Sequence, residues 1–257
     1  TRVEVTSQDE LGQLARDFNQ LAESLEKTET NRRAFMADIS HELRTPLAIL
    51  QGELEAIQDG VRRVTPEAMQ SLQSEVMILK KMVDDLHQLA LSDSGALRYQ
   101  MMNCDLSELL SQVTTAFQQR FAVAGITLSC HCPPQAPFYG DINRLNQLCH
   151  NLMENSLRYT HAPGELRVSL AAQANGWCLE FSDSAPGLTR EQQQHIFDRF
   201  YRAENSRNRA SGGSGLGLAI CRAITDAHQG EISCQHSPAG GVTIRVKLPF
   251  TTDRPDS

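Results

Sequence analysis

The chain reads Phe-Met-Ala-Asp-Ile-Ser-His-Glu-Leu-Arg-Thr-Pro-Leu at residues 35–47. Apolar side chains recur through and beyond this stretch at steps of three and four residues, which predicts an amphipathic helix with one buried stripe. The stripe consists of Phe35, Ile39, Leu43, Leu47, Leu50, Leu54 and Ile57. His41 follows Ile39 by two positions, so at about 100° per residue its imidazole points away from the stripe, toward solvent. Pro46 has no N–H for the carbonyl of Glu42, which predicts a bend directly after the histidine.

Three neighbours make His41 a candidate reactive group. Arg44 and Thr45 follow it at i+3 and i+4, so they share its face of the helix. Glu42 places a carboxylate beside the imidazole. We identify His41, Glu42, Arg44 and Thr45 as candidate catalytic residues; an ordinary surface histidine on a kinked helix is the alternative.

A heptad seam precedes this helix. Its members step by three and four residues in turn, and no Gly or Pro interrupts the chain between the seam and His41. The seam consists of Leu11, Leu14, Phe18, Leu21 and Leu25. This pattern predicts a coiled-coil stalk continuous with the histidine helix. A single amphipathic helix packed on a globular core is the alternative.

A second helix is predicted after Gly60. Thr65 suits its N-cap, Pro66 its first position and Glu67 its first turn, and the helix should close near Gly95. Two helices joined by a short loop form a hairpin that exposes much apolar surface. Two copies side by side would bury that surface as a four-helix bundle.

From about residue 98 the pattern becomes α+β. We expect helices at 106–123, 141–159, 189–197 and 215–229, and strands near 125–131, 165–171, 176–182, 231–236 and 242–248. Strands that follow one another directly predict antiparallel hairpins rather than a doubly wound sheet. Residues 201–214 are expected to form a mobile loop, and the polar tail after Phe250 to be disordered.

Bulk properties exclude several classes of protein. A net charge of −7 over 257 residues argues against a nucleic-acid partner. Seven cysteines without a framework spacing fit a reducing compartment. The run Cys130-His131-Cys132 has no second ligand pair nearby, so we interpret it as the end of a strand rather than a zinc site. No apolar run approaches the roughly 20 residues of a membrane helix, and we expect a soluble piece of a longer protein.

Polar residues on the predicted helix 141–159 suggest a site for a phosphate compound. Asn151 and Asn155 lie at i and i+4, and their carboxamide oxygens suit Mg²⁺ that is held mainly by phosphates. Arg158 can neutralise phosphate oxygens, and Tyr159 offers an aromatic face to a base. The alternative interpretation is that these are ordinary polar residues on the exposed face of an amphipathic helix.

Two further motifs lie later in the chain. Asp183 begins Asp-Ser-Ala-Pro-Gly directly after a predicted strand, where its carboxylate can accept a hydrogen bond from an amine such as adenine N6; ordinary turn chemistry is the alternative. Residues 212–218, Gly-Gly-Ser-Gly-Leu-Gly-Leu, open a helix whose N–H groups can meet phosphates. They lack the Lys-Ser/Thr of a Walker loop, and they do not follow a strand with an acidic residue about twenty positions later, as a dinucleotide fingerprint would. The alternative interpretation of residues 212–218 is a flexible linker.

Together these motifs resemble those of bacterial sensor histidine kinases of the His-kinase-A type. The matching segments are the H box at 35–47, the N box at 151–160, the G1 box at 183–187, the F box at 197–202 and the G2 box at 212–218. Residues 1–27 resemble the second half of a HAMP linker. The G1 box departs from the family at Ala185, where glycine is usual; since Asp183 and Gly187 are kept, we expect ATP binding to persist.

The resemblance implies a multidomain fold: an all-α dimeric four-helix bundle, followed by an α+β two-layer sandwich of the histidine kinase, gyrase and Hsp90 type. The implied domains are a HAMP-derived stalk at 1–28, a dimerisation and phosphotransfer domain at 29–97 and an ATP-binding domain at 98–257. It also implies the cytoplasmic portion of an inner-membrane protein, attached to the membrane only through an N-terminal part missing from this sequence.

The resemblance further implies the roles of the site residues. Asp183 would bind adenine, Tyr159 would stack on it, and Asn155 would ligate Mg²⁺, the one metal expected. Arg199 or Arg202, in a lid between Asp198 and Gly217, would contact the γ-phosphate. The full ATP-binding set is Asn151, Asn155, Arg158, Tyr159, Asp183, Gly187, Arg199, Phe200, Arg202, Gly213, Ser214, Gly215, Leu216 and Gly217.

The implied activity is autophosphorylation of His41 by ATP within a homodimer, with Glu42 orienting the imidazole. A cognate response regulator would then take the phosphoryl group on an aspartate, and Thr45 would position water to dephosphorylate that regulator. Residues 93–98 would serve as the hinge. Two rival readings remain: an ATPase of the same nucleotide-binding fold in which His41 is idle, and a dimeric scaffold that binds ATP poorly because of Ala185.

Overall fold

The computed structural model describes residues 9–184, 186–203 and 214–250. The chain forms two compact units, Thr1–Lys80 and Lys81–Ser257. The second half of helix α2 (Pro66–Asp93) therefore belongs with the α/β part of the chain. Within the described residues, no helix has the length and apolar character to cross a membrane.

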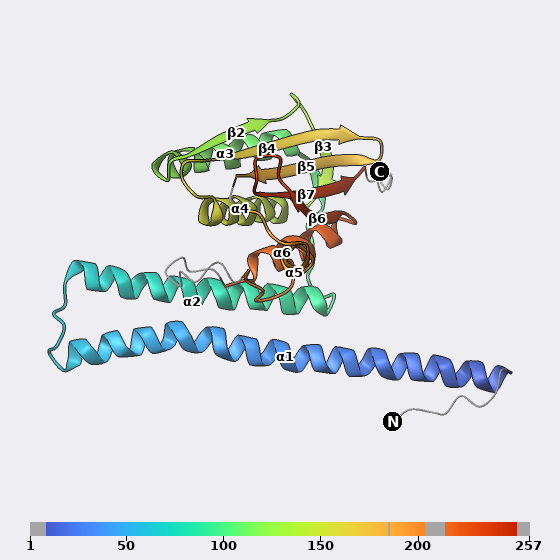
Figure 1. The fold of residues 1–257 in the computed structure, drawn as a ribbon, viewed down its shortest axis with the longest axis horizontal. Helices are drawn as coiled ribbons and strands as arrows, with labels where there is room; N and C mark the ends of the chain where they lie inside the picture. The colour runs from blue at the N-terminus through green and yellow to red at the C-terminus, as the bar shows by residue number, and fades with distance from the viewer. Residues whose placement is uncertain (1–8, 185, 204–213, 251–257) are drawn as a thin grey trace. The chain divides into compact units, whose positions relative to one another are not determined.

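The first unit contains α1 (Glu10–Gln58) and the first half of α2, which run antiparallel (Figure 1). The heptad seam and the His41 stretch do form one continuous helix of 49 residues, as the sequence predicts. Pro46 lies inside this helix, so the loss of one backbone hydrogen bond does not end it. Beside it, the Thr45 hydroxyl donates to the His41 carbonyl at 3.4 Å.

The predicted apolar stripe is not buried throughout within one chain. Leu47 and Leu54 are 58% and 50% exposed, so the expectation that they are buried is wrong for a single copy. The heptad residues Leu14, Leu21 and Leu25 are also largely exposed. Two helices of one hairpin bury only the faces that they turn toward each other. These exposed side chains are therefore available to pack against another protein surface.

The predicted start and end of α2 are confirmed. The Thr65 hydroxyl accepts a hydrogen bond from the Ala68 N–H at 3.2 Å, the N-cap arrangement. At the other end Gly95 has φ +66°, and the Ala96 N–H donates to the Leu91 carbonyl. A glycine in the left-handed region satisfies the last carbonyls of a helix without strain.

The second unit is built on a five-stranded sheet with strand order β2-β4-β5-β7-β6. The strands are β2 (Ile126–His131), β4 (Gly164–Gln173), β5 (Gly176–Asp183), β6 (Glu231–His236) and β7 (Val242–Pro249). The expected antiparallel hairpins β4–β5 and β6–β7 are confirmed, whereas β2 pairs with β4 in parallel. Along β4, buried Leu166, Val168 and Leu170 alternate with more accessible residues, so one face of the strand lies in the core.

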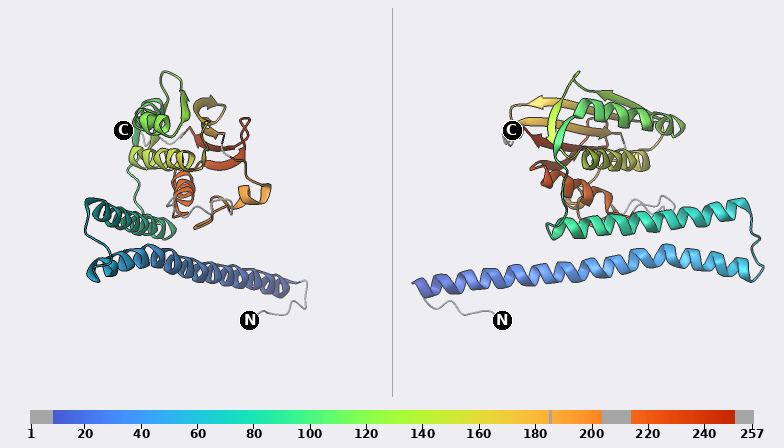
Figure 2. Two further views of the ribbon diagram at one scale, coloured as in Figure 1. Left: turned by 60° about the vertical axis from the view of Figure 1, so that its left-hand side comes forward. Right: turned by 180° about the vertical axis from the view of Figure 1, so that it is seen from behind.

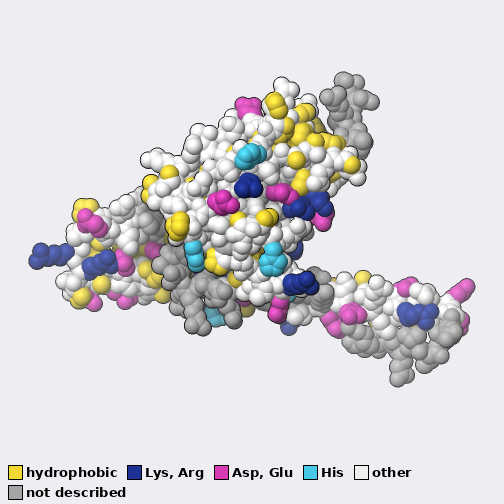
Figure 3. Space-filling model, turned by 45° about the horizontal axis from the view of Figure 1, so that its top comes forward, with side chains coloured by type: hydrophobic (Ala, Val, Ile, Leu, Met, Phe, Trp, Pro, Cys, Tyr) yellow, Lys and Arg dark blue, Asp and Glu magenta, His cyan; other side chains and the backbone are white. Residues whose placement is uncertain are grey.

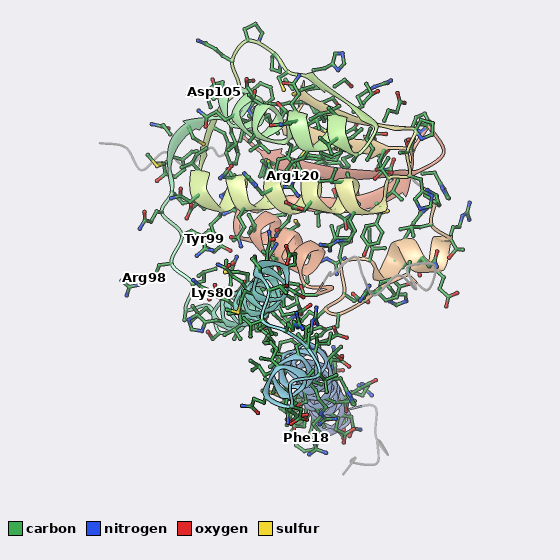
Figure 4. The ribbon with its side chains drawn as sticks, turned by 90° about the vertical axis from the view of Figure 1, so that its left-hand side faces the viewer. Phe18, Lys80, Arg98, Tyr99, Asp105 and Arg120 are labelled. Carbon is green, nitrogen blue, oxygen red and sulfur yellow. The ribbon has the colours of Figure 1, made fainter. Side chains whose placement is uncertain are left out.

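Helices α3 (Leu106–Val123) and α4 (Ile142–Tyr159) lie side by side against this sheet (Figures 2 and 4). Each begins at an aspartate, Asp105 or Asp141, whose side chain accepts two backbone N–H groups of the first turn. Arg120 of α3 donates two hydrogen bonds to Glu154 of α4 and links the helices (Figure 4). The core between helices and sheet includes Phe117, Phe121, Leu145, Leu148, Leu152, Met153, Phe181 and Ile220.

The remaining elements are α5 (Arg190–His195), α6 (Gly217–Ala227) and a two-stranded sheet of β1 (Met102–Asp105) and β3 (Pro137–Gly140). The sequence pattern does not predict β1 and β3. Each has only four residues, too few to show an alternating pattern. The loop expected at 201–214 falls mostly outside the described residues, and so does the tail after Phe250.

Candidate active site

Helix α4 brings the first asparagine of the site to the start of α6. Leu145, Leu148 and Leu152 bury one face of α4, which leaves Asn151 and Asn155 half-buried on another. The Asn151 Nδ2 donates to the Gly217 carbonyl at 3.4 Å. Residues 66 positions apart are therefore in direct contact where the expected phosphate-binding helix begins.

The N-terminus of α6 is suited to an anion. Among the described residues, no side chain caps the first turn of this 11-residue helix, and uncapped N–H groups at a helix start attract phosphate oxygens. Leu216, the residue before the helix, is fully buried and anchors this end. Ser214 is half-buried, and its hydroxyl accepts from the Leu216 N–H at 3.3 Å.

Gly215 lies in close contact with the F-box segment. Its carbonyl accepts from the Phe200 N–H at 3.1 Å, and both residues have positive φ, +69° for Gly215 and 59° for Phe200. A Cβ on Gly215 would lie 2.7 Å from the Phe200 Cα. Only glycine fits this approach without moving the backbone.

Asp183 ends strand β5, as predicted, and is 5% exposed. Its Oδ1 accepts from the Val242 N–H at 2.8 Å, which fixes the carboxylate at the end of the sheet. Gly187 follows, and a Cβ there would approach the Gly240 carbonyl oxygen to 3.2 Å. Ala185 and Gly213 lie outside the described residues.

Arg199 has a partner that no sequence motif predicts. Its Nη2 lies 2.5 Å from Oδ1 of Asp93, the last residue of α2. A second contact joins α2 to α4, because the Gln147 amide donates to Gln88 Oε1 at 2.7 Å. Asp93 and Gln88 are thus site neighbours that the sequence did not reveal, since 106 residues separate Asp93 from Arg199 and no periodic pattern connects them.

Arg158 and Tyr159 end α4, with Arg158 exposed and Tyr159 half-buried. Arg202 is half-buried beyond the F-box phenylalanine. The structure thus brings Asn151, Gly215, Gly217 and Phe200 into one cluster. In this cluster a carboxamide group lies beside an uncapped helix start, which suits the phosphates of a nucleotide with Mg²⁺.

His41 lies in the first unit, apart in sequence from this cluster. Its side chain is exposed, as predicted, and so are Arg44 and Thr45, while Glu42 is half-buried. The imidazole is therefore accessible to a reacting group, and the hydroxyl one turn later is exposed near it.

Comparison with known proteins identifies the family. Residues 140–252 match the family described as histidine kinase-, DNA gyrase B-, and HSP90-like ATPase, residues 31–95 match the His Kinase A (phospho-acceptor) domain, and residues 1–27 match the HAMP domain. The chain belongs to the sensor histidine kinases, which confirms the resemblance and the fold class drawn from its sequence motifs.

Two curated relatives show how similar the chain is to individual sensor kinases. The chain is 59% identical over 253 residues to the signal transduction histidine-protein kinase BaeS of Escherichia coli (strain K12), a match covering 98% of this chain and 54% of that protein. It is 34% identical over 240 residues to the sensor histidine kinase CpxA of the same organism, covering 91% and 50%. The chain spans about half the length of these curated relatives.

Solved structures agree in fold. The Acinetobacter baumannii histidine kinase AdeS matches with a TM-score of 0.71 at 31% identity, covering 82% of this chain and 98% of that one. The histidine kinase ThkA, solved in complex with the response regulator protein TrrA, matches with a TM-score of 0.68 at 20% identity, covering 89% of this chain and 66% of that one.

Proposed function

We propose that this chain transfers the γ-phosphoryl group of Mg-ATP to His41 and then to an aspartate of a response regulator. The observation that carries the proposal is the contact of Asn151 and Gly217 at the uncapped start of α6. That cluster combines a helix N-terminus with an amide side chain and glycines, whose N–H groups can donate hydrogen bonds to phosphate oxygens. His41 supplies the exposed nucleophile in the same chain.

The ATP site assigns a role to each group. The Asp183 carboxylate accepts a hydrogen bond from the adenine amine, and the Tyr159 ring stacks on the base. Asn155 would ligate Mg²⁺, and Asn151 and Arg158 would bind the phosphates. The backbone of Ser214, Gly215, Leu216 and Gly217 encloses the phosphates, and Gly187 shapes the base pocket. Gly213 precedes them in the same sequence motif. Arg199 or Arg202, beside Phe200, neutralises the γ-phosphate. Bound Mg²⁺ would neutralise charge on the β- and γ-oxygens.

His41 performs the chemical step. A neutral ring nitrogen attacks the γ-phosphorus, an N–P bond forms, and the bond to the ADP oxygen breaks. Glu42 accepts a hydrogen bond from the other ring N–H, which selects the tautomer and stabilises the positive charge that develops. Arg44 lies on the same face of the helix, near the incoming phosphate. Thr45 positions the water that dephosphorylates the regulator.

The exposed apolar residues favour a homodimer. On α2, Met69, Val76 and Val83 are each more than half exposed and recur every seven residues, and Leu47 and Leu54 repeat the same interval on α1. Such a spacing suits a four-helix bundle formed by two chains. We assign residues 1–28 to the stalk, 29–97 to the bundle and 98–257 to the ATP-binding domain. Attachment to the inner membrane would come from an N-terminal part outside this sequence.

Incubation with γ-labelled Mg-ATP tests the proposal. The wild type should acquire acid-labile, base-stable label that His41→Ala abolishes, because a phosphoramidate hydrolyses in acid. His87→Ala is the matched control, since His87 is also exposed on a helix of this chain, and it should keep the label. Label that persists in His41→Ala would place the nucleophile elsewhere.

A second assay separates the rival functions. ATP hydrolysis without protein label would identify an ATPase in which His41 is idle. A fluorescent nucleotide that does not bind would favour the scaffold.

Adding a response regulator to labelled protein should move the label to base-labile acyl phosphate on the regulator. Label that stays on the kinase with every regulator tested would contradict the transfer step.

A further inference from the structure

Two thiols that the proposed kinase mechanism does not use approach each other at the edge of the sheet. Cys130 lies near the end of β2 and Cys132 directly beyond it, two positions along an extended chain, so both side chains point to the same side. Their Sγ atoms are 3.3 Å apart. Among the described strands β2 pairs with β4 alone, so the thiols lie on an edge strand.

Accessibility distinguishes Cys130 from the other six cysteines, because Cys130 alone is exposed. Cys130 is exposed and Cys132 half-buried, whereas Cys149, Cys178 and Cys221 are buried. No group of three or more His, Cys, Asp or Glu side chains in the described parts of the chain could hold a metal ion. A zinc site needs more ligands than this pair supplies, which leaves the chemistry of two neighbouring thiols.

The surroundings of Cys130 favour its thiolate. The hydrogen bond between the two thiols outweighs partial burial and lowers the pKa of Cys130 to about 7. The pKa of Cys132 is raised, because its proton is shared with Cys130. The nearby titratable group on α4 is Cys149, whose pKa burial raises to about 12, so it stays neutral. Because Cys130 is also the exposed thiol of the pair, it is the nucleophile and Cys132 is the resolving thiol.

We propose that Cys130 and Cys132 form a redox-active dithiol that hydrogen peroxide converts into an intramolecular disulfide. The Cys130 thiolate attacks the O–O bond, which yields a sulfenic acid and, after protonation of the leaving hydroxide, one water. The Cys132 sulfur then attacks the sulfenic sulfur, the S–S bond forms, and the departing hydroxide takes the Cys132 proton as a second water. The dithiol loses two electrons and two protons, and the peroxide is reduced. Rotation of the two side chains must shorten the 3.3 Å separation to a bond of about 2.0 Å.

Peptide mass analysis of the whole chain tests this directly. No Lys or Arg lies between Arg120 and Arg144, so trypsin releases both thiols on one peptide, residues 121–144, without any other cysteine. After brief peroxide treatment and alkylation, this peptide should lose two hydrogens and escape alkylation. Cys104 and Cys234, both half-buried, are internal controls in the same sample. They should react at least about tenfold more slowly, because burial raises the pKa of each thiol and little of it is ionised near pH 7.

Single substitutions identify the role of each thiol. Cys132→Ser should leave a sulfenic acid on Cys130 that dimedone traps, whereas Cys130→Ser should prevent rapid oxidation of Cys132. The wild-type rate should rise through about pH 7, the pKa of Cys130. Oxidation of Cys104 or Cys234 at the rate of Cys130 would overturn the proposal, and so would disulfides that link only separate chains. Neither readout depends on kinase activity.

Discussion

At the scale of single residues, the site depends on a few positions where only one side chain fits. Gly215 shows this most clearly, because its positive φ and its contact with Phe200 leave no room for a Cβ. Gly217 differs, since a Cβ there would meet its nearest atom, the Asn151 Cγ, at an ordinary 3.9 Å. Of these two glycines in one motif, Gly215 is the one whose backbone conformation and surroundings exclude a larger side chain.

Gly215→Ala should therefore weaken nucleotide binding more than Gly217→Ala. The added methyl forces the Phe200 segment away and strains the backbone by roughly 1–3 kcal/mol, which corresponds to a loss of affinity of about five- to 150-fold. Titration with a fluorescent ATP analogue measures this loss. Gly52→Ala is the control, because Gly52 lies in α1 with open space around it, and it should leave affinity unchanged. Equal affinities of Gly215→Ala and Gly52→Ala would contradict the assignment.

Asp85 makes stability depend on pH. It is 6% exposed, and burial raises its pKa from 3.8 to about 6. Because the folded state disfavours the charged form, the stabilisation from the neutral carboxyl is complete below pH 3.8 and is lost as the pH rises through about 6. Asp85→Asn should thus raise the free energy of unfolding at pH 7 by about 1–2 kcal/mol.

Urea unfolding at several pH values measures that effect. The advantage of Asp85→Asn over wild type should shrink as the pH falls below about 6, because the wild-type carboxyl is then neutral as well. Asp84→Asn, a change at the exposed neighbouring position, is the matched control and should show little effect. An Asp85→Asn protein less stable than wild type at pH 7 would show that the charged carboxylate is favoured instead.

At the scale of elements, the end of α2 is joined to the F-box segment. The Asp93–Arg199 ion pair and the Gln88–Gln147 hydrogen bond connect α2 with the residues around the proposed ATP site. In this arrangement Arg199 is engaged by a carboxylate rather than a phosphate. The contact would have to open for Arg199 to act on the γ-phosphate.

Asp93→Asn should accelerate autophosphorylation by about two- to fivefold. The pair is partly exposed, and such pairs contribute about 0.2–1 kcal/mol, which sets this range. Initial rates of His41 labelling measure it. Glu180→Gln removes another partly exposed ion pair, Glu180–Arg245 on the sheet, and should leave the rate near wild type. A slower Asp93→Asn protein would mean that the contact supports catalysis.

At the scale of the whole molecule, exposed apolar side chains lie among charged ones on both parts of the chain (Figure 3). On α1 and α2, however, the exposed apolar residues recur at heptad intervals, from Leu14 to Val83. Exposed apolar side chains in such regular order are typical of a surface that a partner covers.

Val76→Glu should therefore weaken self-association. A charge at an exposed heptad position costs nothing in the single chain but opposes burial between two copies. Sedimentation should show a dimer for the wild type and mainly monomer for this variant at low micromolar concentration. Ser74→Glu, at an exposed position on the same helix outside that heptad, is the control. A variant that remains dimeric would exclude this face from the interface.

The sequence by itself determined the elements with strong periodicity and the motifs of continuous residues. The long helix through His41, the caps of α2 and the hairpins of the sheet follow from local patterns, because helix and strand periods are properties of short stretches. Asp183 at a strand end was predictable for the same reason. Tertiary structure alone decided which distant residues meet: Asn151 with Gly217, Phe200 with Gly215, Arg199 with Asp93, and the parallel pairing of β2. These contacts depend on how buried faces of helices and strands pack together, and no local pattern records that packing.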